Sequence, residues 1–130
     1  MMKDAIFKGG QNGLRIKSWA RPSHMFVQGV QFLDVVMLNV QNPIVIDQNY
    51  CPHNLNCPAS GVKVSDVLFQ NIQGTSATAI AINLDCRAAN PCSRITLENV
   101  SLTCNKQVAQ SCCNNAIGKT SSLVHPTSCL

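Results

Sequence analysis

Short runs of alternating apolar and polar residues recur along this chain. In "GLRIK", "PIVID" and "AIAIN", leucine or isoleucine stands at every second position. A period of two is typical of β-strands that bury one face, because successive side chains of a strand point to opposite sides. The inward positions predicted for these strands are Leu14, Ile16, Ile44, Ile46, Ile80 and Ile82.

A second pattern recurs at intervals of about thirty residues in "VQFLDVVM", "VKVSDVLF" and "ITLENVSL". Short strands separated by Asn, Asp and Gly, with little helical periodicity, predict an all-β solenoid of the parallel β-helix type. Each copy carries an acidic or amide residue, and we expect Asp34, Asp66 and Asn99 to stack at one corner of the coils. This structural role is favoured over a catalytic one, and it argues against glycosylation of Asn99 in its "NVS" sequon.

The residues between the inward positions form an outward face. Two cations on this face, Arg15 and Lys17, fit either a solvated strand or the recognition of carboxylates, which a guanidinium binds through two parallel hydrogen bonds. Tyr50 follows at the exit of one strand as a candidate stacking platform. The two columns predicted across the coils are Arg15, Val45 and Ala81, and Lys17, Asp47 and Asn83.

Composition limits the classes of protein to which the chain can belong. Its 130 residues suit a single domain, residues 1–130, and 12% charged residues suit neither a disordered tail nor a helical bundle built on ion pairs. The net charge of +4 favours an anionic partner, but the basic residues are too scattered for a nucleic-acid footprint. No apolar run reaches the length of a signal peptide or the roughly 18 residues of a membrane span, so we expect no membrane partner.

The chain has eight cysteines, and none of them forms the CxxC motif of a zinc ribbon or a redox site. We therefore expect disulfides rather than a metal site, in an oxidising extracellular compartment. The loops "CPHNLNC" and "CRAANPC" predict the pairs Cys51–Cys57 and Cys86–Cys92. The other four lie in a predicted cysteine-rich C-terminal cap, residues 104–130, with three pairings possible: Cys104, Cys112, Cys113 and Cys129.

Three segments, "NGLRIKSW", "NPIVIDQNYC" and "IQGTSATAIAINLDC", together resemble the C-terminal third of plant polygalacturonases, the pectin hydrolases of glycoside hydrolase family 28. The resemblance implies a right-handed parallel β-helix, truncated at its N-terminal side, from a secreted, monomeric cell-wall enzyme without a cofactor. Its substrate would be the α-1,4-linked galacturonate chain of pectin. The resemblance implies that Arg15 and Lys17 bind galacturonate carboxylates and that Tyr50 lies in the active site. The strand pattern brings Asp47 to the same cleft, as a further substrate-binding candidate.

The family's catalytic carboxylates lie in "NTD" and "DD" motifs and its active-site histidine in "GHG", and none of these motifs occurs in this sequence. Hydrolysis with inversion needs an acid and a base held about 6.5 to 9.5 Å apart. We therefore expect the chain to carry substrate-binding residues without hydrolysing pectin by itself. The first hypothesis is a part of a polygalacturonase whose other coils hold the catalytic groups. The alternatives are a non-catalytic module that binds acidic polysaccharide and a disulfide-stapled solenoid without a ligand.

Overall fold

The computed structural model describes the whole chain except residues 1, 20–25, 51–62, 87–90 and 106, and the side chains of residues 17–19, 26 and 48–50 also lie outside the description. Within the described residues, the strands form a five-stranded sheet (sheet A) and a four-stranded sheet (sheet B). Sheet A has the order β1 (Met2–Lys8), β3 (Phe26–Val40), β5 (Lys63–Ser76), β7 (Cys92–Cys104) and β9 (Ala116–His125). Sheet B has the order β2 (Asn12–Trp19), β4 (Asn42–Tyr50), β6 (Ile80–Asp85) and β8 (Gln110–Asn114).

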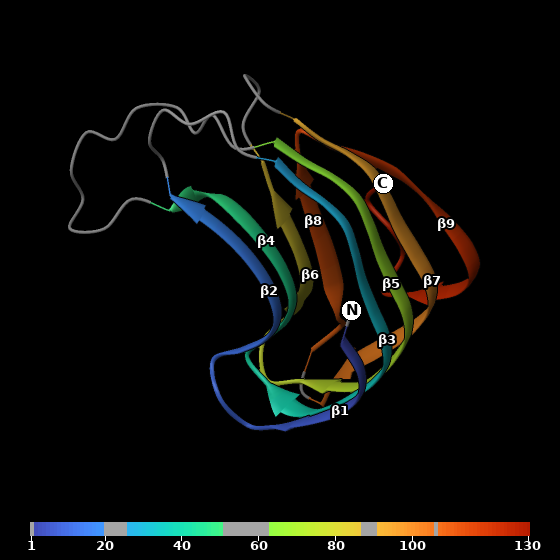
Figure 1. Cartoon of the computed structure of the whole chain (residues 1–130). Coiled ribbons are helices and arrows are strands. Elements are labelled where there is room, and N and C mark those ends of the chain that lie inside the picture. The colour runs from blue at the N-terminus through green and yellow to red at the C-terminus, as the bar shows by residue number, and fades with distance from the viewer. Residues whose placement is uncertain (1, 20–25, 51–62, 87–90, 106) are drawn as a thin grey trace.

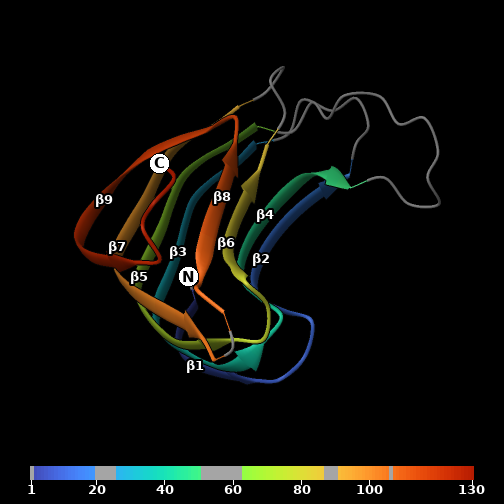
Figure 2. The same ribbon diagram turned by 180° about the vertical axis from the view of Figure 1, so that it is seen from behind.

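The chain alternates between the two sheets, and each strand pairs with the strand two elements further on. All seven pairings are parallel, so each strand of one sheet and the next strand of the other form one coil that stacks on the coil before it. Figures 1 and 2 show the two sheets facing each other, with the long strands of sheet A bending as they cross the molecule. The predicted parallel β-helix is confirmed.

The core fills the space between the sheets with stacked rows of apolar side chains. In sheet A, Phe32 lies beside Phe69, with ring centroids 5.2 Å apart and planes 15° from parallel. In sheet B, Leu14, Ile44 and Ile82 form one row, since the register pairs them across three strands. Each such side chain contributes about 1.5 to 3 kcal/mol when it is fully buried. The alternation read from the sequence therefore reports the inner face of sheet B, although Ile80 is only half-buried at the start of its strand.

The corner stack differs from the one expected. Asn71, and not Asp66, stands between the two outer members: its Nδ2 donates to Asp34 Oδ1 at 2.9 Å, and Asn99 Nδ2 donates to Asn71 Oδ1 at 2.7 Å. All three have φ between 51° and 57°, the left-handed conformation that Asn and Asp tolerate better than most residues. The expected alignment failed because the coils differ in length, and an alignment at constant intervals slips by several residues.

Asp66 belongs to a second bend of sheet A. The register places it between Gly29 of β3 and Arg94 of β7, and all three residues have positive φ. Its carboxylate pairs with the neighbouring cation, with Arg94 Nε 2.9 Å from Asp66 Oδ1. A structural role for Asp66 is therefore retained, at a different corner from the predicted one.

Two disulfides are present in the described residues. Cys86 and Cys92 are bonded, the pairing that the short loop predicts, and both are buried. Among the last four cysteines, Cys113 of β8 is bonded to Cys129, whereas Cys104 and Cys112 are free thiols. Leu130 packs against the core next to the last coil. That residues 104–130 act as a cap stays a prediction, and Cys51 and Cys57 lie outside the described residues.

Candidate functional site

The outer face of sheet B carries the residues predicted to bind a substrate. Its inner residues are apolar, so the intervening positions of β2, β4, β6 and β8 face away from the core. The register corrects the predicted columns at their third member, because Val45 pairs with Asn83 and Asp47 with Asp85. The two rows of this face are Arg15, Val45, Asn83 and Cys112, and Lys17, Asp47, Asp85 and Asn114.

Arg15 lies close to a carboxylate of the neighbouring strand, that of Asp47. Its Nη2 lies 3.8 Å from Asp47 Oδ2, and the two side chains are 31% and 26% exposed. A contact of this length between partly solvated groups contributes about 0 to 1 kcal/mol to stability. At 3.8 Å the contact is longer than a hydrogen bond, so Asp47 attracts the guanidinium electrostatically without occupying its N–H donors.

Val45 forms an apolar floor beside Arg15. It is 8% exposed, and its strand position places it on the outer face, apart from the core cluster. Asn83 follows on β6 and Cys112, an exposed free thiol, on β8. Along this row a cation, Arg15, is followed by an apolar residue, Val45, and an amide, Asn83. An acidic sugar can use these groups to place its carboxylate, its ring and its hydroxyls, respectively.

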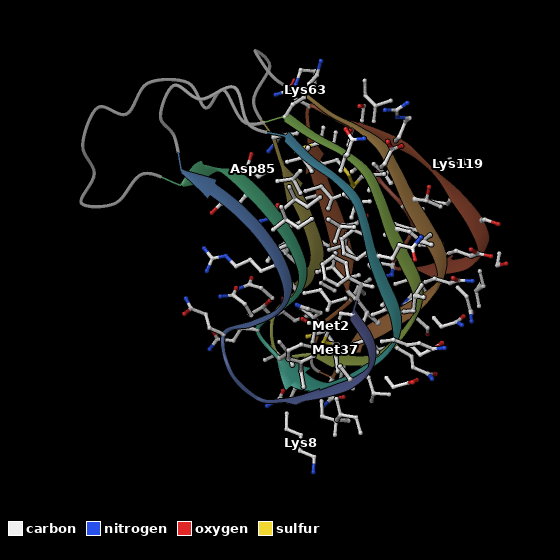
Figure 3. The ribbon with its side chains drawn as sticks, viewed as in Figure 1. Met2, Lys8, Met37, Lys63, Asp85 and Lys119 are labelled. Carbon is white, nitrogen blue, oxygen red and sulfur yellow. A yellow bond between two sulfur atoms is a disulfide. The ribbon has the colours of Figure 1, made fainter. Side chains whose placement is uncertain are left out.

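The second row carries the acidic groups of the face. Asp47 and Asp85 occupy paired positions on neighbouring strands, and Asn114 Nδ2 donates to Asp85 Oδ1 at 3.4 Å. Figure 3 labels Asp85 at the upper end of sheet B. Asp34 lies at the corner and Asp66 on sheet A, so Asp47 and Asp85 are the carboxylates that the described residues bring to this face.

Lys17 and Tyr50 are placed by their backbones alone. Lys17 pairs with Asp47, in the row next to Arg15, and Tyr50 ends β4 beside Trp19 of β2. Their side chains lie outside the description, and their roles remain predictions. Sequence reasoning placed Asn83 in the wrong row of the face and did not anticipate Cys112. The alternation of apolar and polar residues indicated that these side chains face outward, but it did not predict the register that decides which residues of neighbouring strands they lie beside.

The arrangement suits recognition by charge and hydrogen bonding. Within the described ranges, no three His, Cys, Asp or Glu side chains gather closely enough to hold a metal ion. No helix in the same part of the chain is long and apolar enough to cross a membrane. The chemistry available at the face is a guanidinium, two carboxylates and amides on a rigid strand scaffold.

Comparison with known proteins identifies the class to which this fold and face belong. The model of the glycosyl hydrolases family 28 matches residues 1–125, and the chain belongs to that family. The right-handed parallel β-helix implied by the resemblance agrees with this membership.

Several individual proteins similar to this chain are plant polygalacturonases. The chain is 53% identical over 131 residues to a polygalacturonase of Prunus persica, covering 99% of this chain and 33% of that protein. It is 40% identical to polygalacturonase QRT2 of Arabidopsis thaliana, over 88% of this chain and 27% of that protein, and 41% identical to an exopolygalacturonase of Oenothera organensis, over 78% and 29%. The chain therefore spans a third or less of these relatives. No solved structure matches it significantly.

Proposed function

We propose that this chain is the galacturonate-binding part of a polygalacturonase that hydrolyses the α-1,4-galacturonosyl linkages of pectin. The observation that carries the proposal is the placement of Arg15 on the outer face of sheet B, oriented by Asp47 and bordered by the apolar floor of Val45. Family membership and the polygalacturonase relatives support the substrate class.

Each group of the face has a part in this proposal. Arg15 binds a galacturonate carboxylate through two parallel hydrogen bonds, and Lys17 adds a point charge one strand step away. Asp47 orients Arg15 and accepts hydrogen bonds from sugar hydroxyls. Tyr50 adds an aromatic surface at the end of β4. The cell wall is the proposed location, which the Cys86–Cys92 and Cys113–Cys129 disulfides support.

We further propose that the chain binds pectin without cutting it. Hydrolysis with inversion needs a carboxylic acid and a carboxylate base in defined positions on either side of the scissile bond. Asp47 lies beside Arg15 and Asp85 accepts a hydrogen bond from Asn114, and the family's "NTD", "DD" and "GHG" motifs do not occur in this sequence. The catalytic acid and base of the proposed enzyme would therefore belong to other coils. A non-catalytic module that binds acidic polysaccharide uses the same face and differs only in lacking such coils.

A binding experiment tests the proposal. The chain is titrated with unesterified polygalacturonate, with fully methyl-esterified polygalacturonate and with neutral galactan. We expect binding to the unesterified polymer, and Arg15→Gln should weaken it about tenfold, since a charge-assisted hydrogen bond is worth about 1.5 to 3 kcal/mol. Lys8→Gln removes an exposed cation of sheet A and serves as the matched control. Equal affinity for the esterified polymer, or an effect of Lys8→Gln as large as that of Arg15→Gln, would contradict the proposal.

A further inference from the structure

Sheet A has a hollow on its outer surface, on the other side of the molecule from Arg15. It measures about 620 Å³, within the range of about 300 to 1,000 Å³ typical of small-ligand sites. Its lining residues come from four successive strands, β3, β5, β7 and β9. Four neighbouring strands span about 14 Å along the coil axis, so the hollow is long enough for several units of a linear polymer.

The bend at Gly29, Asp66 and Arg94 shapes one wall of this hollow. These residues have φ of 72°, 55° and 53°, and together they turn the strands of sheet A at the same level in three coils. Gly118 of β9 allows close approach at the floor, since a Cβ there would lie 1.9 Å from the backbone oxygen of Ile95. The backbone therefore sets the bend beside the hollow, and side chains of the four strands complete its lining.

The charge of the hollow is cationic. Arg94 and Lys119 line it together with one carboxylate, Asp66, which already pairs with Arg94. That pairing leaves part of the guanidinium's donor capacity for a second acceptor, because one carboxylate accepts at most two of its five donors. Lys119 has no carboxylate within 4.0 Å among the described residues. The hollow is therefore lined by two cations and one carboxylate, an excess of one positive charge.

The remaining lining matches a sugar chain better than a compact anion. The register places Gln31, Leu68, Thr96 and Lys119 in one row across the four strands. The amide and hydroxyl of this row can bond sugar hydroxyls, and Leu68 with the 63% exposed Ile117 can cover the apolar face of a ring.

From this geometry we infer that the hollow of sheet A is a second binding site for acidic polysaccharide, separate from the face of sheet B. Lys119 and Arg94 bind carboxylates of the polymer there, and no bond is cut. The inference rests on the proposed function for the class of polymer, galacturonate. Such a site would hold the protein on its insoluble substrate while the opposite face is free to bind another segment.

The test counts and separates the two sites in the full 130-residue chain. The chain is titrated by calorimetry with a short unesterified oligogalacturonate, and we expect two molecules bound per chain. Arg15→Gln should leave one of them, whose dissociation constant Lys119→Glu raises about tenfold. The double variant Arg94→Gln with Asp66→Asn removes the ion pair as a unit and should weaken the same site. Lys63→Glu, which changes an exposed lysine of β5 outside the hollow, is the matched control (Figure 3).

The outcomes distinguish this inference from the proposed function. One bound molecule that Arg15→Gln abolishes, or equal effects of Lys63→Glu and Lys119→Glu, would overturn the second site and leave the first standing. Binding that Lys119→Glu abolishes and Arg15→Gln does not alter would overturn the first site alone. A polyglutamate peptide that binds with the same affinity and the same dependence on Lys119 would overturn the assignment to a carbohydrate. Thermal melts of every variant report whether the fold is intact.

Discussion

Arg15 and Asp47 lie on neighbouring strands of one sheet face, with Nη2 of the arginine 3.8 Å from Oδ2 of the aspartate. Asp85 stands one strand further along the same row as Asp47, where its carboxylate meets Asn114. The face therefore offers two carboxylates, those of Asp47 and Asp85. The contact with Arg15 is made by Asp47. This difference makes the orientation of the guanidinium testable.

Replacing Asp47 with Ala should weaken galacturonate binding about threefold, because the variant loses the contact that orients Arg15, worth about 0 to 1 kcal/mol. Asp85→Ala removes the same charge from the face without touching Arg15, and should leave the affinity equal or slightly higher. Titration with oligogalacturonate measures both. Tighter binding by the Asp47 variant would mean that this carboxylate only competes with the substrate for Arg15.

The corner ladder predicts a loss of stability at Asn71. Asn71→Ala removes the hydrogen bonds to Asp34 and Asn99 and places alanine at φ 55°, and should lower the free energy of unfolding by about 2 to 3 kcal/mol. Asn71→Gly relieves the backbone term but not the lost bonds, so a smaller loss of about 1 to 2 kcal/mol is expected. Urea unfolding compares the two, and equal stability of both variants and the parent would show the ladder to be dispensable.

Gly74 marks a close approach between β5 and β3. Its φ is 134°, and a Cβ there would lie 1.9 Å from the backbone oxygen of Met37. Gly74→Ala must displace backbone, and should cost about 3 kcal/mol or more. Gly10→Ala is the control, since its φ is also positive, at 85°, but a Cβ would meet nothing within 4 Å. Its cost should be about 1 to 2 kcal/mol, and a loss in thermal stability as large as that of Gly74→Ala would contradict the steric explanation.

The buried disulfide between Cys86 and Cys92 should contribute measurably to stability. Replacing both cysteines with Ala is expected to lower the free energy of unfolding by about 2 to 4 kcal/mol. Cys112→Ala changes an exposed free thiol and should alter stability by less than about 0.5 kcal/mol. Urea unfolding of the double variant, and of the parent with and without a reductant, measures this contribution. A double variant as stable as the oxidised parent would mean that packing alone holds the loop.

Local pattern was sufficient to predict the strands and the inner face of sheet B except at the start of β6, where Ala81, expected to face outward, is buried in the core and Ile80 is only half-buried. Leu14 and Ile16 alternate with Arg15, and a strand buried on one side has to place these residues on opposite faces. The Cys86–Cys92 bridge was predictable for a similar reason, since its loop is too short to allow many partners. The outward position of Arg15 followed from the same local rule.

Register between coils was not predictable in the same way. Asn83 took the place expected for Ala81, and Asn71 the place expected for Asp66, because loops of unequal length decide which residues of successive coils become neighbours. A repeat interval inferred from similar sequence segments does not show how long each intervening loop is. The hollow at Arg94 and Lys119 was missed for the same reason, since its residues are distant in sequence and join only through the pairing of β7 with β9.

The sequence by itself determined that this protein is a parallel β-helix with a cationic strand, since side-chain alternation and repeated turn residues act within a few positions of the chain. Only the tertiary structure decided which side chains share a row: Arg15 with Asn83, Asp34 with Asn71, Thr96 with Lys119. Those neighbourhoods arise from hydrogen bonds between coils, which form wherever the core packs best and are independent of a constant spacing along the chain.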